Sequence, residues 1–186
     1  MKNLGFTIGI IILLLQSCKK ENYVEWIKTN ETNTKATFSK GRLVSSEVFD
    51  KSAKLDSKYI YHNGTVIKIY KYYPNKKISS YSYLHKAPNH FTSTIYFNNG
   101  KIASEGEIDF YKGENLYLKR GPWIFYSKTG EPYAVYTFTH DNKNQYIKGE
   151  MLFDTIKKKI TRDVIFDPPV LAEKETEEVV HLFNPK

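Results

Sequence analysis

The stretch Tyr96-Phe-Asn-Asn-Gly100-Lys-Ile-Ala-Ser104-Glu-Gly-Glu107 contains the clearest local structural pattern of the chain. An aromatic residue ends one segment, Asn99-Gly100 is suited to the positive φ angles of a tight turn, and Ile102 restarts the chain. After Ile102, apolar or small residues alternate with Glu105, Glu107 and Asp109, which is typical of a strand with one solvated face. We therefore expect a β-hairpin that turns at Gly100.

The same pattern recurs along the chain. Phe38-Ser-Lys-Gly-Arg-Leu-Val-Ser45 repeats the order Phe-x-x-Gly-basic-aliphatic-x-Ser, and weaker copies surround Gly64, Lys76 and Gly130. Lys76 stands where the other copies have glycine. A recurring hairpin signal predicts an all-β fold, an antiparallel meander of repeated β-hairpins that forms a long twisted or curled sheet over residues 35–166. Residues 167–186 are expected to be a short C-terminal extension, because Asp167-Pro168-Pro169 should end the sheet.

Composition supports this fold class. Aromatic residues make up 15% of the 186-residue chain and only two residues are Met, which favours sheets over helical bundles. With 40% hydrophobic and 26% charged residues the chain is typical of globular proteins, and its single cysteine excludes a disulfide scaffold.

The N-terminus has the organisation of an export signal. Lys2 precedes an uncharged apolar run over residues 4–15, which is shorter than the roughly 20 residues that a transmembrane helix needs. Leu15-Gln16-Ser17-Cys18 then resembles the lipobox of bacterial lipoproteins. That resemblance implies a signal peptide over residues 1–17, and a diacylglyceryl anchor and often a further acyl chain such as palmitate on Cys18. Residues 18–34, in which lysines alternate with glutamates, are expected to form a polar tether.

The residue after the cysteine bears on localisation. Lys19 occupies the position where many bacteria use Asp to retain lipoproteins in the inner membrane, so the sequence favours the outer membrane of the cell envelope. Periplasmic and surface-facing orientations both stay open. The formal net charge of +8 raises the alternative of nucleic-acid binding, which we do not expect of an exported, lipid-anchored chain.

The segment Gly121-Pro-Trp-Ile-Phe-Tyr126-Ser-Lys-Thr-Gly-Glu131 carries a second resemblance. With Tyr96–Glu107 it is similar to the MORN-repeat variant of secreted bacterial proteins, whose unit reads Gly-x-Trp-x-x-Tyr, a Gly-Lys-Leu turn and a strand. The resemblance implies stacked β-hairpins in one antiparallel sheet. An unrelated β-meander with convergent Asn-Gly turns is the alternative.

The aromatic surplus offers a candidate binding surface. A single-layer sheet cannot bury both faces, so part of the tyrosine-rich region near residues 59–83 should be exposed. For Trp123 we weigh core packing, the more frequent role, against an exposed partner-binding role. The candidate residues for this surface are Tyr72, Tyr73, Tyr81, Tyr83 and Trp123.

No catalytic set is visible in the sequence. The histidines, His62, His85, His90, His140 and His181, lack zinc-site spacing, and Gly-x-Ser-x-Gly and phosphate-binding glycine loops are absent. His85 and His90 are expected in a loop around Pro88, and Glu105, Glu107 and Asp109 on a solvated face. We therefore expect no enzyme activity, catalytic residue, metal or cofactor.

Together these observations predict a membrane-anchored lipoprotein whose MORN-like domain is a non-catalytic binding or scaffolding module with a protein partner. The alternative is an antitoxin or immunity-type protein that neutralises a toxin, because relatives of these repeats include such proteins. The C-terminal extension could continue as a short helix from about Ala172 to Leu182 or as a mobile tail.

Overall fold

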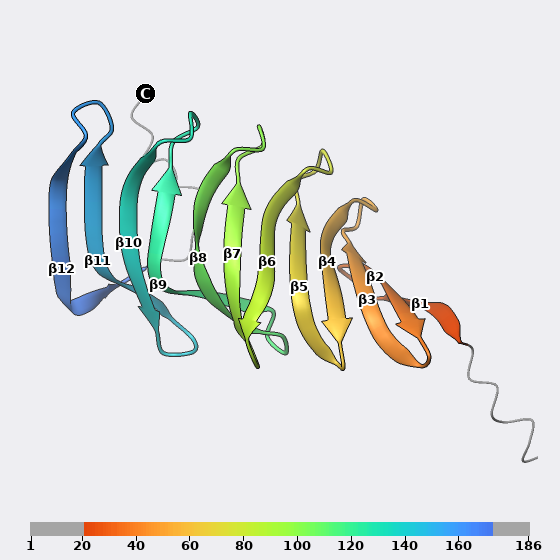
Figure 1. The fold of residues 1–186 in the computed structure, drawn as a ribbon. Helices are drawn as coiled ribbons and strands as arrows, with labels where there is room; N and C mark the ends of the chain where they lie inside the picture. Colours follow the sequence, from red (N-terminus) through yellow and green to blue (C-terminus); the bar gives the residue numbers. More distant parts are fainter. Residues whose placement is uncertain (1–20, 173–186) are drawn as a thin grey trace, which may run out of the picture. The chain divides into compact units, whose positions relative to one another are not determined.

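The computed structural model describes residues 21–172, which form β-strands joined by turns and contain no helix (Figure 1). None of these residues therefore forms a helix long and apolar enough to cross a membrane. The strands are β1 (Asn22–Lys28), β2 (Asn33–Ser39), β3 (Arg42–Phe49), β4 (Leu55–His62), β5 (Thr65–Tyr72), β6 (Ile78–Lys86), β7 (His90–Tyr96), β8 (Ile102–Tyr111), β9 (Leu116–Tyr126), β10 (Pro132–His140), β11 (Gln145–Asp154) and β12 (Lys159–Leu171).

The strands follow one another in the sheet in the order in which they occur in the sequence. The neighbouring pairs run antiparallel, so the predicted all-β antiparallel meander is confirmed. β1 and β12 are the two edge strands. The chain divides into two compact units, Met1–Val66 and Ile67–Lys186.

Two hairpins of the first unit turn as their sequences predict. At Lys40-Gly41 the φ angles are +49° and +72°, and at Asn63-Gly64 they are +48° and +80°. Two consecutive positive φ angles define the type I′ turn, whose twist matches that of the adjoining strands. Within the strands, Glu47 of β3 receives hydrogen bonds from Lys58 of β4 at 3.0 Å and from Lys35 of β2 at 3.3 Å, which lower the pKa of its carboxyl group, the bond from Lys58 most strongly.

Hairpins of the second unit use a different turn. The N–H of Phe97 donates to the carbonyl of Lys101, and the N–H of Gly100 donates back to the carbonyl of Phe97, both at 2.8 Å. The turns that begin at Tyr73 and Ser127 have the same pair of hydrogen bonds. In each turn the fourth residue has a positive φ, +67° at Lys76, +87° at Gly100 and +98° at Gly130. The weak repeat at Lys76 is therefore a true structural repeat, with lysine in a conformation that favours glycine.

The first two of these turns are each joined to the next turn through the lysine that follows them. Lys77 Nζ donates to the carbonyl of Asn98 in the next turn at 3.0 Å, and Lys101 Nζ donates to the carbonyl of Thr129 at 2.8 Å. The Gly-basic pattern of the repeat thus has a structural role, in which each lysine satisfies a backbone carbonyl of its neighbour.

The sheet extends past the predicted bounds at both ends. Residues 22–28, expected in a polar tether, form β1, and their backbone pairs along the whole length of β2. Asp167-Pro168-Pro169, expected to end the sheet, lies within β12. Proline is tolerated there because β12 is an edge strand and residues 166–169 bulge outward opposite the single residue Lys148. The predicted helix or tail after Ala172 lies outside the described residues, as do the signal peptide and Cys18.

The core of the second unit lies on one face of its strands, where the sheet curls over itself. Phe91 on β7 and Phe110 on β8 are 1% and 5% exposed, and their rings meet edge to face at 6.0 Å. Tyr117, at the start of β9, stacks on Phe110 at 4.6 Å. Lys71 of β5 lies over the Tyr117 ring, 3.9 Å from its centre. Since β5 and β9 are not neighbours in the sheet, this contact shows that the β8–β9 hairpin folds back across the strands before it.

Candidate functional site

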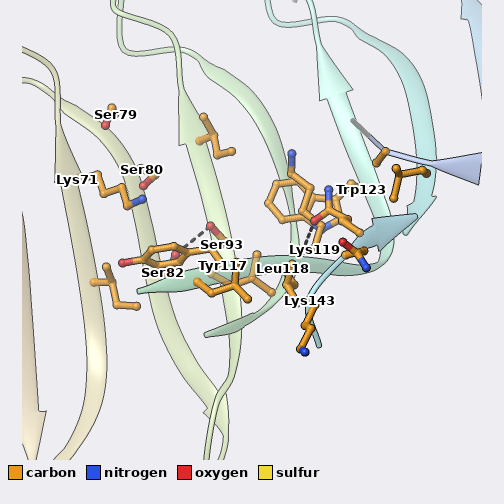
Figure 2. Close-up of a pocket in the computed structure, with 18 of the residues that line it drawn as sticks. Lys71, Ser79, Ser80, Ser82, Ser93, Tyr117, Leu118, Lys119, Trp123 and Lys143 are labelled. Carbon is orange, nitrogen blue, oxygen red and sulfur yellow. Dashed lines mark hydrogen bonds between the residues drawn. The ribbon is translucent and has the colours of Figure 1, made fainter. Parts of the chain in front are cut away.

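A cavity of about 580 Å³ opens on this curled face of the second unit (Figure 2). Its volume falls within the range of roughly 300–1,000 Å³ that is typical of small-molecule sites. Strands β5 to β9 supply most of its wall, and the β10–β11 turn and the end of β12 complete it. The lining residues on which the site's chemistry depends are Lys71, Ser79, Ser80, Tyr117, Lys119, Trp123 and Lys143.

A row of small side chains accounts for the depth of the cavity. Ile69, Ser82, Ser93 and Gly106 face one another in register across β5 to β8. Ser82 Oγ donates to Ser93 Oγ at 2.9 Å, so these buried hydroxyls satisfy each other. Trp123 covers Gly106 at the far end of the row. Large residues at the serine positions would fill the space that the curled hairpin encloses.

Lys119 is the most unusual residue of the cavity wall. It is only 6% exposed, and its Nζ lies 4.9 Å, 5.7 Å and 5.3 Å from the ring centres of Trp123, Phe125 and Phe138. Aromatic faces attract an ammonium group, which offsets part of the cost of its burial. Burial nevertheless lowers the pKa of Lys119 to about 8, because desolvation disfavours the charged form.

Two groups of cationic and polar residues lie on either side of the cavity. Figure 2 shows Lys71 with Ser79 and Ser80 on one side and Lys119 with Lys143 on the other. Tyr117 and Leu118 lie between these two groups. No Asp, Glu, His or Cys lines the cavity among the described residues. The described part of the lining therefore favours anions.

A separate polar cluster surrounds Asp109, on the opposite face of β8. Asp109 is 5% exposed and lies opposite His90 in the register of β7 and β8. His90 Nδ1 is hydrogen-bonded to Asp109 Oδ1, and His140 Nε2 lies 2.9 Å from Asp109 Oδ2. Arg120 Nη1 lies 3.6 Å from Asp109 Oδ1. The cluster thus ties together four consecutive strands, β7 to β10.

The hydrogen bonds at His140 and His90 restrict what this cluster can do. His140 Nδ1 accepts a hydrogen bond from the backbone N–H of Asn142 at 3.3 Å, so the ring proton is on Nε2, which donates a hydrogen bond to Asp109. Both nitrogens of His140 are therefore used in holding the structure. His90 Nδ1 also lies 2.7 Å from Arg120 Nη1, and it can either accept from Arg120 or donate to Asp109, depending on its tautomer.

The Asp109 cluster differs from what the sequence predicts. Asp109 was expected on a solvated face, and His90 and His85 in a loop, whereas Asp109 is buried, His90 begins β7 and His85 belongs to β6. The reason is that the ends of β7, β8 and β10 converge, so the imidazoles of His90 and His140 both contact the carboxylate of Asp109.

Glu105, also expected on the solvated face, is half-buried and accepts a hydrogen bond from the Tyr126 hydroxyl at 2.6 Å, which raises the pKa of Tyr126 to about 12. Within residues 21–172, no group of three or more His, Cys, Asp or Glu could hold a metal ion.

The candidate tyrosines do not form one surface. Tyr81 lies between Tyr70 and Tyr83, at ring-centre distances of 5.0 Å and 6.1 Å, and Tyr83 is 44% exposed. Tyr72 pairs with Ile78 at the end of the same two strands, β5 and β6. Tyr73 belongs to the next turn instead, where it lines the cavity and its hydroxyl donates to the carbonyl of Tyr96 at 2.5 Å.

Trp123 requires a correction. It is 0% exposed, so it cannot belong to an exposed binding surface, and the core-packing interpretation is the right one. Its Nε1 donates to the carbonyl of Glu107 at 2.8 Å. The sequence analysis also missed Lys71 and Lys119, since nothing in the local pattern shows that the β8–β9 hairpin, which contains Lys119, folds back over Lys71. The available signal for Lys119 was its position among the aromatic residues of the same strand, such as Tyr117 and Trp123.

Comparisons with known proteins identify no family. The chain matches no protein-family model and no curated protein. Among solved structures it is similar to TarM with a TM-score of 0.29 and 10% identity, over 83% of this chain and 24% of that chain. It is also similar to a DUF3836 family protein from Bacteroides vulgatus, with a TM-score of 0.16 and 10% identity, over 82% of this chain and 99% of that chain. A DUF3836 family protein from Parabacteroides distasonis gives a TM-score of 0.14 and 11% identity, over 78% and 88%. Likenesses this distant give no guide to function.

Proposed function

We propose that this chain is a lipid-anchored, non-catalytic binding module of the cell envelope. The lipobox-like segment that ends at Cys18 supports the anchor, since two or three acyl chains hold a protein stably at a membrane. The cavity of the second unit supports a binding role. The protein partner expected from the sequence stays a prediction beside this ligand.

The observation that carries the binding role is the combination of Lys71, Lys119 and Lys143 around one cavity whose described lining residues include no Asp or Glu. Burying the ammonium group of Lys119 costs free energy, whereas an apolar side chain of similar length, such as methionine, could be buried at the same position without that cost. An anion in the cavity would be attracted by these ammonium groups, because opposite charges attract more strongly where water is excluded.

The anchor is tested by metabolic labelling with palmitate. The full-length chain should incorporate label and fractionate with membranes, and Cys18→Ala should lose both properties. Label that persists in Cys18→Ala would contradict the anchor.

The binding role is tested by native mass spectrometry of Cys18→Ala purified from its own envelope. We expect an adduct of small mass that is reduced when Lys71→Met and Lys119→Met are added to the same chain. Lys68→Met is the matched control, because Lys68 is an exposed lysine of the same strand as Lys71 and lies on the opposite face. An adduct-free wild type, or an adduct that survives both substitutions, would contradict the role of the cavity.

A further inference from the structure

We propose that the edge strand β1 docks on the lipid surface to which Cys18 anchors the chain. The contact is made by the β1 patch, which consists of the exposed apolar residues Val24, Trp26 and Ile27. This inference rests on the proposed lipid anchor and adds to it a second contact, made by the folded sheet itself. It follows from the open edge of β1, the exposure of its apolar side chains and the short chain between Cys18 and the sheet.

β1 lacks the protection that the other edge strand has. Among the described residues only β2 pairs with it, so one row of its backbone N–H and C=O groups faces away from the sheet (Figure 1). Such an edge attracts other chains unless charge, proline or a bulge protects it. β12 has all three, with Lys157–Lys159 at its start and a bulge at Pro168-Pro169. β1 has no proline, no register shift and one lysine, Lys28, as suits an edge that is covered.

The apolar side chains of β1 find little cover within the sheet. Val24, Trp26 and Ile27 are 47%, 57% and 53% exposed. Their register partners on β2 are two threonines and a lysine, so no apolar side chain lies directly opposite them. The Trp26 ring meets the Phe49 ring at a centre distance of 5.7 Å and still stays more than half exposed. Because Val24 and Trp26 lie on one face and Ile27 on the other, apolar surface borders the open edge on both faces.

The chain leaves little distance between the anchor and this edge. The backbone N–H of Lys40 donates to the carbonyl of Glu21, so the sheet holds the chain from Glu21 onward. Only Lys19 and Lys20 separate Cys18 from that point. A chain spans at most about 3.6 Å per residue, so Glu21 lies within roughly 11 Å of the anchored cysteine. The headgroup layer on each side of a bilayer is about 5–8 Å thick, so β1 starts in this layer or directly above it.

A lipid surface suits both the side chains and the backbone of β1. Tryptophan prefers the boundary between hydrocarbon and water, where its ring has apolar neighbours and its N–H meets polar groups. The open backbone edge would be unsatisfied in hydrocarbon, so we expect β1 at the level of the headgroups and not deeper. The anchor holds the β1 patch near the surface at a high effective concentration, so a contact that is weak by itself becomes populated.

Charge does not decide this contact. Residues 19–31 contain three lysines and three glutamates, so this part of the chain has no net charge. The attraction of basic residues to anionic lipid therefore adds little. We expect the β1 patch to dock on neutral phosphatidylcholine as well as on anionic phosphatidylglycerol, and the docking to persist when salt is added.

The experiment uses the lipid-anchored chain, extracted from membranes and reconstituted in phosphatidylcholine vesicles. Trp26 and Trp123 are its two tryptophans, and the Trp26→Phe chain gives the emission of the buried Trp123 alone. Phosphatidylcholine that is brominated on its acyl chains quenches tryptophan at the membrane, whereas acrylamide quenches tryptophan in water. Brominated lipid should quench at least about half of the Trp26 emission, because an interfacial ring lies next to the acyl chains.

A second reporter locates the contact. Asp56→Trp in the Trp26→Phe chain places a tryptophan at an exposed position of β4, three strands from β1 and thus roughly 14 Å away along the sheet. We expect acrylamide to quench this reporter at least about threefold more strongly than Trp26, because only the edge strand reaches the lipid. Brominated lipid should quench the β4 reporter weakly.

Serine substitutions test the apolar side chains. Val24→Ser combined with Ile27→Ser should make Trp26 accessible to acrylamide and reduce its quenching by brominated lipid. Ile160→Ser combined with Ile165→Ser is the matched control, since it removes two exposed apolar side chains from the other edge strand. The control should leave both kinds of Trp26 quenching unchanged, and equal effects of the two double variants would contradict a specific role of the β1 patch.

Two further results would overturn the docking. Weak lipid quenching of Trp26, or equal lipid quenching of Trp26 and of the β4 reporter, would exclude a contact through the edge strand. Protection of Trp26 from acrylamide in envelope membranes but not in vesicles of pure lipid would show that a protein covers β1. In each case palmitate on Cys18 would leave the anchor in place, whereas an unlabelled chain would exclude both, so the two failures are distinguishable.

Discussion

The indole ring of Trp123 lies directly against Gly106 of the neighbouring strand, so closely that a Cβ on Gly106 would be 2.6 Å from three ring atoms. A register shift makes this possible. Ile124 pairs with Glu105, but Glu107 pairs with Arg120, so residues 121–123 lie opposite the single residue Gly106. The extra residues form a bulge that lets the ring lie flat on the strand, where it forms the floor of the cavity.

Gly106→Ala should therefore destabilise the protein. The added methyl group has to displace the fully buried Trp123 ring, and overpacking of this kind costs typically about 1–3 kcal/mol. Urea denaturation would measure the loss in the free energy of unfolding. It is followed by Trp123 fluorescence in a Trp26→Phe background, where Trp123 is the single tryptophan. Gly113→Ala is the matched control, because a Cβ there meets nothing within 4 Å. Equal stability of the two variants would show that the ring adapts without cost.

The fold class was predictable because its signals are local. Lys40-Gly41 and Asn63-Gly64 form the expected turns with positive φ angles, and the alternation after Ile102 gives the buried positions Ser104, Ile108 and Phe110. The extent of the sheet was less predictable. A polar segment such as residues 22–28 becomes a strand because its backbone can pair with the open edge of β2. Composition does not reveal whether such an edge is available.

The cavity and the Asp109 cluster were not predictable from local pattern. Lys71 and Tyr117 meet only because a hairpin folds back over the sheet, and His90 and His140 meet Asp109 from strands on either side of it. The alternation predicts the correct face for Asp109, but the burial of that face depends on His90, Arg120 and His140, which belong to other strands. MORN-like membership and the lipid anchor stay predictions.

Lys76→Gly should stabilise the protein. Lys76 has φ +67°, a conformation that costs an L-residue with a side chain roughly 1 kcal/mol and costs glycine little. Part of the gain is lost because glycine is more flexible in the unfolded chain. We expect a net increase of about 0.5 kcal/mol in the free energy of unfolding, measured in urea.

The reverse substitution in the equivalent turn is the control. Gly100 has φ +87° and open space around a Cβ, so Gly100→Ala changes the backbone strain without a steric clash. It should lower the free energy of unfolding by about 1 kcal/mol. If both substitutions change stability in the same direction, backbone strain is not what distinguishes these two turns.

Asp109→Asn should destabilise the second unit by about 2 kcal/mol, because hydrogen bonds to a charged group are stronger than neutral ones. An amide keeps one acceptor, but its NH₂ group faces an imidazole where the carboxylate accepted from His140. Thermal unfolding followed by circular dichroism would measure the loss. Asp163→Asn on the exposed edge strand β12 is the control and should have no effect. An unchanged melting temperature in Asp109→Asn would show that the cluster contributes no net stability.

Lys119 should make stability rise with pH in the alkaline range. Its pKa is lowered to about 8 in the folded state, whereas an unfolded lysine titrates near about 10.4. Between these values the unfolded state binds more protons than the folded state, so raising the pH favours folding by up to about 3 kcal/mol in total. Below about pH 8 both states carry the charge, and its burial cost is constant. Lys119→Met should therefore be at least as stable as the wild type near pH 7, and its advantage should shrink between about pH 8 and pH 10. Urea denaturation across this range, with Lys68→Met as the exposed control, measures the difference directly, and a constant difference would place the Lys119 pKa outside the range.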